Sequence, residues 1–126
     1  MKKAISIDGA PAPIGPYSQA ILMDKTLYVS GQIPLNPFTG LMVNDTIEEA
    51  TTQVLENIQN LLLASGFEKS DIVKCSIFMK DMNEFAQMNA IYGSFFDAIP
   101  PARETVQVAK LPMDVRIEIS CIAIKN

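Results

Sequence analysis

The chain has 126 residues, of which 48% are apolar and 19% are charged, so we expect residues 1–126 to form one domain with its own core. A net charge of −4 and the lack of a basic run argue against binding to nucleic acid, which requires clustered Lys and Arg. Because the chain contains no histidine, Ser-His and Cys-His catalytic pairs are excluded, and a zinc site is not expected.

Two further features bear on where the protein works. The N-terminal segment MKKAISIDGA contains two lysines, but Asp8 ends its apolar stretch before it reaches the length of a signal peptide. No run approaches the ~18 apolar residues of a membrane-spanning helix. Cys75 and Cys121 each lie in an apolar, strand-like pattern, which favours buried free thiols over a disulfide between them. We therefore expect a cytoplasmic protein that does not contact a membrane.

The first part of the chain predicts three strands separated by loops. Two apolar runs flank Asp24 and Lys25, a pair that is typical of a tight turn between neighbouring strands. Segments rich in Pro and Gly predict the longer loops. The strands are expected at residues 2–7, 17–24 and 26–33, and the loops at 9–16 and 34–45.

A long amphipathic helix is expected over residues 45–66. Thr46 and Glu49 have the spacing of a capping box, and Gly66 is a residue type that commonly ends a helix. Two acidic residues in the first turn suit the helix dipole. The apolar stripe of this helix comprises Ile47, Ala50, Val54, Ile58, Leu61 and Leu62.

Regular alternation of side chains predicts a strand over residues 71–81. One face comprises Val73, Cys75, Ile77 and Met79, and the other comprises Lys74, Ser76, Phe78 and Lys80. A second helix is expected over residues 81–99, with Asp81 as its cap and Glu84 three residues further on. Its buried stripe comprises Phe85, Met88, Tyr92, Phe95 and Phe96.

Two strands, over residues 102–110 and 113–126, complete the order β-β-β-α-β-α-β-β. This order predicts an α+β protein of two layers, in which both helices cover one face of a mixed sheet. In the last strand, the residues expected to face the helices are Val115, Ile117, Ile119, Cys121 and Ala123, and those expected to face away are Arg116, Glu118, Ser120, Ile122 and Ile124. Because the second face is half apolar and also carries Phe78, we expect another subunit to cover it.

The last two strands carry the residues that are able to do chemistry. Arg103, Thr105 and Gln107 alternate onto one face of the first of these strands, whereas Glu104 points to the opposite face. We expect the two strands to form a hairpin in which Thr105 lies opposite Glu118. In this register Arg103 shares a face with Glu118.

Both charged residues also have ordinary structural interpretations. An arginine at the start of a strand is usually a solvated charge or part of a surface ion pair. Glu118 would serve equally as an edge residue or in a salt bridge between subunits. Glu is nevertheless a poor strand former and is rarely buried without a partner, so a functional site is the other interpretation.

Four segments, in order, resemble the RidA (YjgF) family of imine deaminases. They are APIGPYSQA, YVSGQIPLNPFTG, VKCSIFMKDMNEFAQMNAIYGSFF and PPARETVQVAKLPMDVRIEISCIAI, within residues 4–125. The resemblance implies a chorismate-mutase-like fold and a homotrimer with clefts between its subunits. It also implies hydrolysis of 2-iminobutanoate and 2-iminopropanoate to 2-oxo acids and ammonia.

The resemblance also implies roles for individual residues. Arg103 would bind the substrate carboxylate, and Glu118 would handle water and protons. Residues Tyr17, Ser30, Gly31 and Asn89 fall on positions that line the pocket. Many relatives have Cys where this chain has Thr105 and Glu where it has Ser120. We expect Thr105 to act in substrate binding through its backbone, because the hydrolysis needs no protein nucleophile.

Imine hydrolysis requires little from the protein besides orientation and proton transfer. A protonated imine is already electrophilic, and the planar fork of Arg matches a carboxylate. A partly desolvated Glu has a raised pKa that suits acid–base work. We therefore expect no metal and no organic cofactor. Two alternatives are a non-catalytic module that binds 2-oxo acids and, less favoured by the negative charge, an RNA-binding inhibitor of translation.

Overall fold

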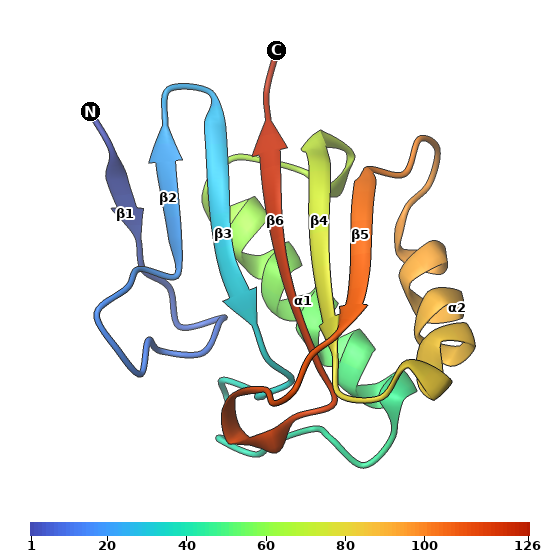
Figure 1. The fold of residues 1–126 in the computed structure, drawn as a ribbon. Helices are drawn as coiled ribbons and strands as arrows, with labels where there is room; N and C mark the ends of the chain where they lie inside the picture. Colours follow the sequence, from blue (N-terminus) through green and yellow to red (C-terminus); the bar gives the residue numbers. More distant parts are fainter.

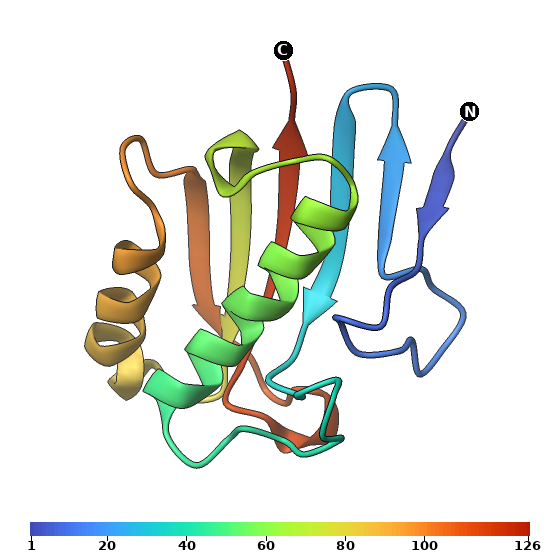
Figure 2. The same cartoon turned by 180° about the vertical axis from the view of Figure 1, so that it is seen from behind.

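The computed structural model describes residues 1–126 and consists of a six-stranded sheet with two helices on one face (Figures 1 and 2). The strands are β1 (Lys3–Ile5), β2 (Ala20–Met23), β3 (Thr26–Gln32), β4 (Ile72–Met79), β5 (Ala102–Gln107) and β6 (Ile117–Ile124), and the helices are α1 (Ile47–Ala64) and α2 (Phe85–Phe95). Their order across the sheet is β1-β2-β3-β6-β4-β5. Only β4 and β5 are parallel neighbours. The predicted α+β architecture and element order are confirmed.

β2 and β3 form the predicted hairpin, with Asp24 in its turn. Asp24 has φ = 51°, a left-handed conformation that Asp tolerates in tight turns. The ladder between β3 and β6 shifts register between Val29 and Gln32. Such an irregularity bends a strand and changes the direction of its side chains. It lies at Ser30 and Gly31, two residues of the predicted site.

α1 crosses the central strands diagonally on one face of the sheet and lies in front of them in the view of Figure 2. Thr46 Oγ1 accepts a hydrogen bond from the Glu49 N–H at 3.1 Å, so Thr46 is the predicted cap. Gly66, with φ = 80°, ends the helical segment in the left-handed conformation that glycine adopts without steric cost. The predicted apolar stripe is buried in the core, and each of its large side chains contributes roughly 1.5–3 kcal/mol to stability.

The predicted faces of β4 are wrong at the start of the strand. Val73 is 44% exposed, whereas Ile72 is buried. The ladder between β4 and β6 shifts register between Ile72 and Lys74, and the extra residue reverses the alternation at that point. Beyond the shift the predicted alternation is confirmed, and the buried residues are Cys75, Ile77 and Met79.

α2 packs beside α1 at the β5 end of the sheet (Figure 2). A short 3₁₀ turn precedes it, capped by the Asp81 side chain. The helix ends at Phe95, earlier than predicted, and Phe96 already has extended backbone geometry (φ = −100°, ψ = 137°); Pro100 would in any case disfavour helical geometry at Ile99. Met88 and Tyr92 are buried, and the three phenylalanines of the predicted stripe pack against the core.

β5 and β6 do not form the predicted hairpin. β5 is an edge strand that runs parallel to β4, and β6 lies between β3 and β4 (Figure 1). Arg103 is therefore paired with Cys75, and Glu118 with Phe78. The predicted pairing of Thr105 with Glu118 is wrong. Because β6 is long and apolar, a central position satisfies its backbone groups on both sides and leaves the more polar β5 at the edge.

The two faces of the sheet differ as the sequence predicts for β6. Its helix-facing side chains are buried, whereas the alternate ones are partly exposed. On the helix-free face, Tyr28 and Ile124 are 49% and 45% exposed. Cys75 and Cys121 are opposite each other in the core and are free thiols, as predicted. Neither helix has the length and apolar character that a membrane crossing demands.

Candidate functional site

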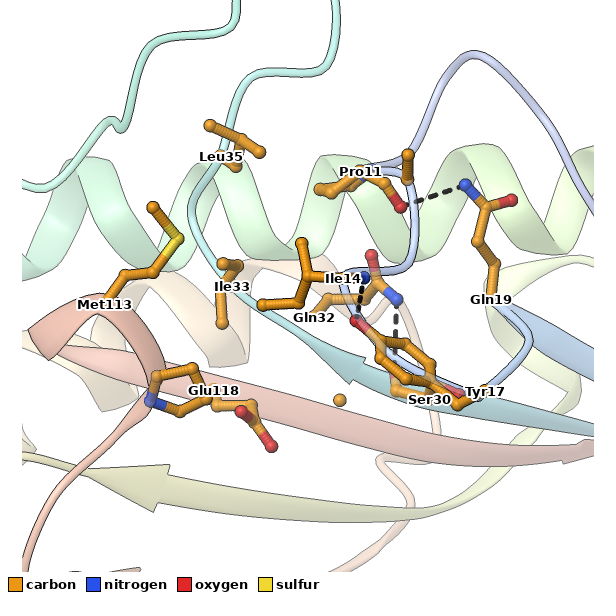
Figure 3. A pocket seen from close by; sticks show the side chains of 13 residues that line it. Pro11, Ile14, Tyr17, Gln19, Ser30, Gln32, Ile33, Leu35, Met113 and Glu118 are labelled. Atoms are coloured by element: carbon orange, nitrogen blue, oxygen red, sulfur yellow. Dashed lines mark hydrogen bonds between the residues drawn. The ribbon is translucent and has the colours of Figure 1, made fainter.

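A cleft of about 370 Å³ opens between the loop that precedes β2, the end of β3 and the segment that leads into β6 (Figure 3). Four of the predicted site residues line it, namely Tyr17, Ser30, Gly31 and Glu118. The rest of its wall is mainly apolar. A concave, mostly apolar cleft with a few polar groups is the usual form of a small-molecule site.

Glu118 is half-buried in this cleft. It forms no ion pair within the chain, and burial raises the pKa of its carboxyl above the ordinary value. A Cβ atom at Gly31 would lie 2.7 Å from Glu118 Cδ, which is closer than two such carbon atoms approach in proteins. Glycine at position 31 therefore allows the carboxyl group to lie against β3, a role that the sequence analysis missed.

Ser30 and Tyr17 lie at one end of the cleft (Figure 3). The Ser30 hydroxyl donates to the Ser18 carbonyl oxygen at 2.6 Å, and the Ser30 N–H donates to the Gln19 carbonyl oxygen at 3.0 Å. These bonds tie the loop to β3. The Tyr17 hydroxyl accepts a bond from the Ile14 N–H at 3.4 Å. Its own proton is therefore available to a ligand.

Two buried glutamines in the cleft wall were not predicted. Gln19 Nε2 donates to three carbonyl oxygens within residues 7–11 and so fixes the loop. Gln32 is 4% exposed, its Nε2 donates to the Ser30 carbonyl oxygen at 3.1 Å, and its Oε1 has no partner. One sequence signal could have identified Gln32, namely its position near the end of the apolar run TLYVSGQI, which suggests burial. A buried Gln normally has hydrogen-bond partners, so a buried amide there would have pointed to a polar neighbour or a ligand.

Arg103 lies outside the cleft, where β5 contacts α2. Its Nη1 donates to Asn89 Oδ1 at 2.7 Å. Its guanidinium carbon is 4.8 Å from the centre of the Tyr92 ring and 5.6 Å from that of Phe85, so aromatic faces support the cation. None of the four ion pairs of the protein includes Arg103. Its remaining N–H donors are free to bind a carboxylate.

The residues that follow Arg103 point in alternate directions. Glu104 lies on the helix-free face, where it forms an ion pair with Lys74 at 2.7 Å and accepts a hydrogen bond from Ser76. The hydrogen bond from Lys74, followed by that from Ser76, lowers the pKa of Glu104. Glu104 thus lies on the face opposite to Arg103, as predicted, and pairs with Lys74 instead of Arg103. Thr105 shares the face of Arg103, and its Oγ1 is buried without a partner.

The predicted site residues thus form two groups within one chain. The first lines the cleft and supplies a carboxyl suited to proton exchange. The second comprises Asn89, Arg103 and Thr105 and supplies an oriented cation. Because the guanidinium is on the helix-covered face of the sheet and the Glu118 carboxyl is on the other face, the expectation that the two share a face is wrong. A small ligand in one chain cannot contact both groups.

Comparison with known proteins gives matches over the whole chain. The sequence profile of the family described as endoribonuclease L-PSP matches residues 7–125. The RutC family protein PH0854 of Pyrococcus horikoshii is 49% identical over 126 residues, covering 100% of both chains. The 2-iminobutanoate/2-iminopropanoate deaminase of Salmonella typhimurium is 45% identical over 129 residues, again covering 100% of both.

Solved structures agree with these sequence matches. The Rid-family protein YyfA of Yersinia pestis superimposes with a TM-score of 0.96 at 48% identity, covering 99% of this chain and 100% of that one. A likeness of this extent includes the sheet, both helices and the segments that line the cleft. The chain therefore belongs to the endoribonuclease L-PSP family, which includes the RidA-type deaminases that its sequence resembles.

Proposed function

We propose that the protein hydrolyses reactive 2-imino acids, such as 2-iminobutanoate and 2-iminopropanoate, to 2-oxo acids and ammonia. The name of the Salmonella relative supports this substrate class. The observation that carries the proposal is that Arg103 and Glu118 each lack an oppositely charged partner within the chain. Charged groups held in place without a partner are typical of sites in which a ligand completes the arrangement.

The active site lies between two copies of the chain, which assembles as a homotrimer. Arg103 of one copy reaches the cleft that contains Glu118 of the next, which resolves their separation within a single chain. The partly exposed apolar residues of the helix-free face, among them Tyr28 and Ile124, support its burial by other copies. In a closed ring each copy contributes one face to each of two sites, and the number of three follows from the family resemblance.

In the proposed reaction, Arg103 binds the substrate carboxylate through two parallel hydrogen bonds. Glu118, as a carboxylate, accepts a proton from water while the water oxygen bonds to the imine carbon. The substrate is the protonated imine, so the electron pair of its C=N bond moves to nitrogen and gives a neutral carbinolamine. Glu118 then returns its proton to that nitrogen, and ammonia leaves as the hydroxyl group gives its proton to the Glu118 carboxylate and the C=O bond forms; Glu118 afterwards releases this proton to water.

The surrounding residues orient this reaction. Asn89 holds Arg103 by the hydrogen bond from Nη1, and the backbone at Thr105 lies beside the bound carboxylate. Tyr17 closes the cleft over the alkyl group and has a hydroxyl proton to offer the ligand. No step needs a protein nucleophile, so threonine at position 105 suffices. General acid–base catalysis contributes roughly 10²–10⁴-fold, which suits a substrate that already reacts with water.

A coupled assay tests this function. Threonine dehydratase acting on threonine supplies 2-iminobutanoate, and the release of 2-oxobutanoate is followed with and without the protein. We expect the wild-type protein to accelerate the release. The acceleration by Arg103→Ala should be smaller than that by the wild type by a factor of more than about 30, because truncating one partner of a desolvated ion pair costs several kcal/mol.

Lys2→Ala is the matched control, since it removes an exposed positive charge that directly precedes β1 and does not line the cleft. This variant should retain the wild-type rate. Acceleration by Arg103→Ala equal to that of the wild type would contradict the proposed role of Arg103. No acceleration by the wild type would contradict the function itself.

Two other functions fit the residues less well. A module that only binds 2-oxo acids would also use Arg103, but a receptor for an anion gains nothing from the carboxyl of Glu118 in the same site. An endoribonuclease, the activity in the family description, has to bind phosphates, and the net charge of −4 opposes this. Electrophoretic mobility of RNA at physiological salt should therefore remain unchanged when the protein is added.

A further inference from the structure

The cleft that contains Glu118 has an apolar wall that the smallest imines would leave largely uncovered. Ile14, Ile33, Leu35 and Met113 contribute to this wall. In Figure 3 their side chains lie together on one side of the cleft, with the Glu118 carboxyl on the other. Ile14 and Met113 are 72% and 65% exposed. Exposed apolar side chains around a concavity are typical of a site that buries an apolar part of its ligand.

The volume of the cleft supports the same conclusion. About 370 Å³ lies within the range of roughly 300–1,000 Å³ that is usual for small-molecule sites. 2-Iminopropanoate carries only a methyl group on its imine carbon, so even with Arg103 of the next copy at the cleft it would leave most of the apolar wall without a contact from the ligand. A branched butyl side chain, as in the imine derived from leucine, would cover Ile33 and reach toward Met113.

Met113 is held at the cleft by an unusual turn. Met113 and Asp114 have φ values of 54° and 55°, in the left-handed region that Asp tolerates but that is strained for a long side chain such as Met. The Asp114 N–H donates to the Leu111 carbonyl oxygen at 3.1 Å, and its carboxylate pairs with Lys80 at 2.9 Å. Such strain persists only where the surroundings fix it, and it is common beside functional sites. Here it places an adaptable thioether at the edge of the cleft.

We propose that the site prefers 2-imino acids with long apolar side chains, and that Met113 determines this preference. The inference rests on the proposed function and names the substrate class of the same site. Substrates of this class arise when aliphatic amino acids are oxidised at their α-carbon. The Met113 side chain packs over the distal part of the substrate side chain, while Arg103 and Glu118 act on the carboxylate and the imine carbon.

The size of the preference follows from burial of the substrate side chain. Each methylene group removed from water changes kcat/KM by about fourfold. The leucine-derived imine should therefore be hydrolysed with a kcat/KM at least tenfold higher than that of the alanine-derived imine. Met113→Ser removes the apolar contact with the distal carbons only. It should lower kcat/KM at least fivefold more for the leucine-derived imine than for the alanine-derived one.

The test uses D-amino-acid oxidase to release the two achiral imines from D-alanine and D-leucine, with catalase present to remove hydrogen peroxide. Semicarbazide traps the imine that remains, and the fall in the rate of semicarbazone formation gives the rate of hydrolysis. Leu63→Ser is the matched control, because Leu63 is an exposed apolar residue of α1 that does not line the cleft. It should match the wild type with both imines.

The outcomes separate this inference from the function on which it rests. A higher kcat/KM for the alanine-derived imine, or an equal loss with both imines in Met113→Ser, would overturn the preference and leave the deaminase function intact. No hydrolysis of either imine by the wild type would overturn both. Circular dichroism of the two variants checks that each is folded like the wild type.

Discussion

Glu118 and Arg103 have surroundings that suit different tasks. Glu118 is half-buried and has no cation beside it. Burial disfavours the charged form of its carboxyl group and so raises its pKa. Arg103 remains charged at any physiological pH and is oriented by Asn89 and two aromatic rings. A group that exchanges protons and a group that keeps its charge are the combination that imine hydrolysis requires.

Replacement of Glu118 by Gln tests the proton-transfer role. We expect kcat to fall by roughly 10²–10⁴-fold, because the amide cannot accept a proton from water, while the product 2-oxobutanoate still binds to Arg103. In the wild type, activity should fall with decreasing pH through the raised pKa of Glu118, above the ordinary value of about 4.3. The measurements are a pH profile of kcat and calorimetric titration with product. Loss of product binding with an unchanged kcat would reverse the assignment of roles.

The same variant makes a prediction for stability. Because the pKa of Glu118 is raised in the folded state, the native protein holds this proton more tightly than the unfolded chain. The stabilisation is complete below the unfolded pKa and is lost as pH rises through the folded pKa. The free energy of unfolding of Glu118→Gln should therefore rise relative to that of the wild type as pH rises. The change should be less than about 1 kcal/mol, because the Glu118 carboxyl is only half-buried and is partly screened by water. Urea unfolding at acidic and neutral pH measures this difference.

Single residues also show what the sequence could and could not predict. Alternating patterns placed Arg103, Glu104 and Glu118 on the correct strands, and the family resemblance pointed to the cleft residues. The close approach of Gly31 to Glu118 was not predictable, because it depends on which strands are neighbours. Gln32 was missed because a single amide in an apolar run does not indicate which way it points.

At the level of elements, α2 and β5 together orient the guanidinium. β5 supplies Arg103, and α2 supplies Asn89, Tyr92 and Phe85 from successive turns of its inner face. The hydroxyl of Tyr92 is buried beside the Cys75 thiol, and burial raises its pKa. The Tyr92 hydroxyl is thus held against β4, while the face of the Tyr92 ring lies against the Arg103 guanidinium. The short helix therefore holds the guanidinium of Arg103 in place.

This arrangement predicts different effects for two changes at Tyr92. Tyr92→Leu removes the aromatic face and should raise KM by roughly 2- to 30-fold, the value of a cation–π contact, with a smaller change in kcat. Tyr92→Phe keeps the ring and should retain a KM close to that of the wild type. KM and kcat from the coupled assay, with thermal unfolding as a check of the fold, give the comparison. Equal losses in both variants would indicate a role in packing alone.

The pairing of strands was the main element-level feature that the sequence did not determine. Periodicity identified all six strands and both helices, because alternation and helical stripes depend only on local sequence. The segment between β5 and β6 is short and suggested a hairpin. It instead crosses the end of the sheet through the turn at Pro112–Asp114, so that β6 pairs with β3 and β4. Non-local pairing of this kind leaves no trace in the spacing of residues.

For the whole molecule, the proposal that each site combines two copies leads to a complementation experiment. Arg103→Ala and Glu118→Gln subunits, each inactive alone, are mixed in equal amounts, unfolded and refolded together. If Arg103 and Glu118 of one site come from different copies in a ring, random assembly restores about a quarter of the sites. The mixture should therefore recover about a quarter of wild-type activity in the coupled assay.

Two controls complete the experiment. Each variant is refolded alone to show that refolding by itself restores nothing, and size-exclusion chromatography with light scattering reports the number of copies in each sample. A mixture that contains mixed oligomers but stays as inactive as its components would show that the two residues act within one chain. Recovery well above a quarter would contradict random assembly of a ring.

The contact between Gly31 and Glu118 has a consequence for how such a protein can change during evolution. A methyl group at position 31 would displace the Glu118 carboxylate from its position against β3. Arg103, on the other face of the sheet, would not be affected. Under the proposed roles of Arg103 and Glu118, the altered chain would still bind an organic acid but would no longer hydrolyse it. A single glycine-to-alanine replacement would then convert the proposed hydrolase into a protein that only binds its ligand.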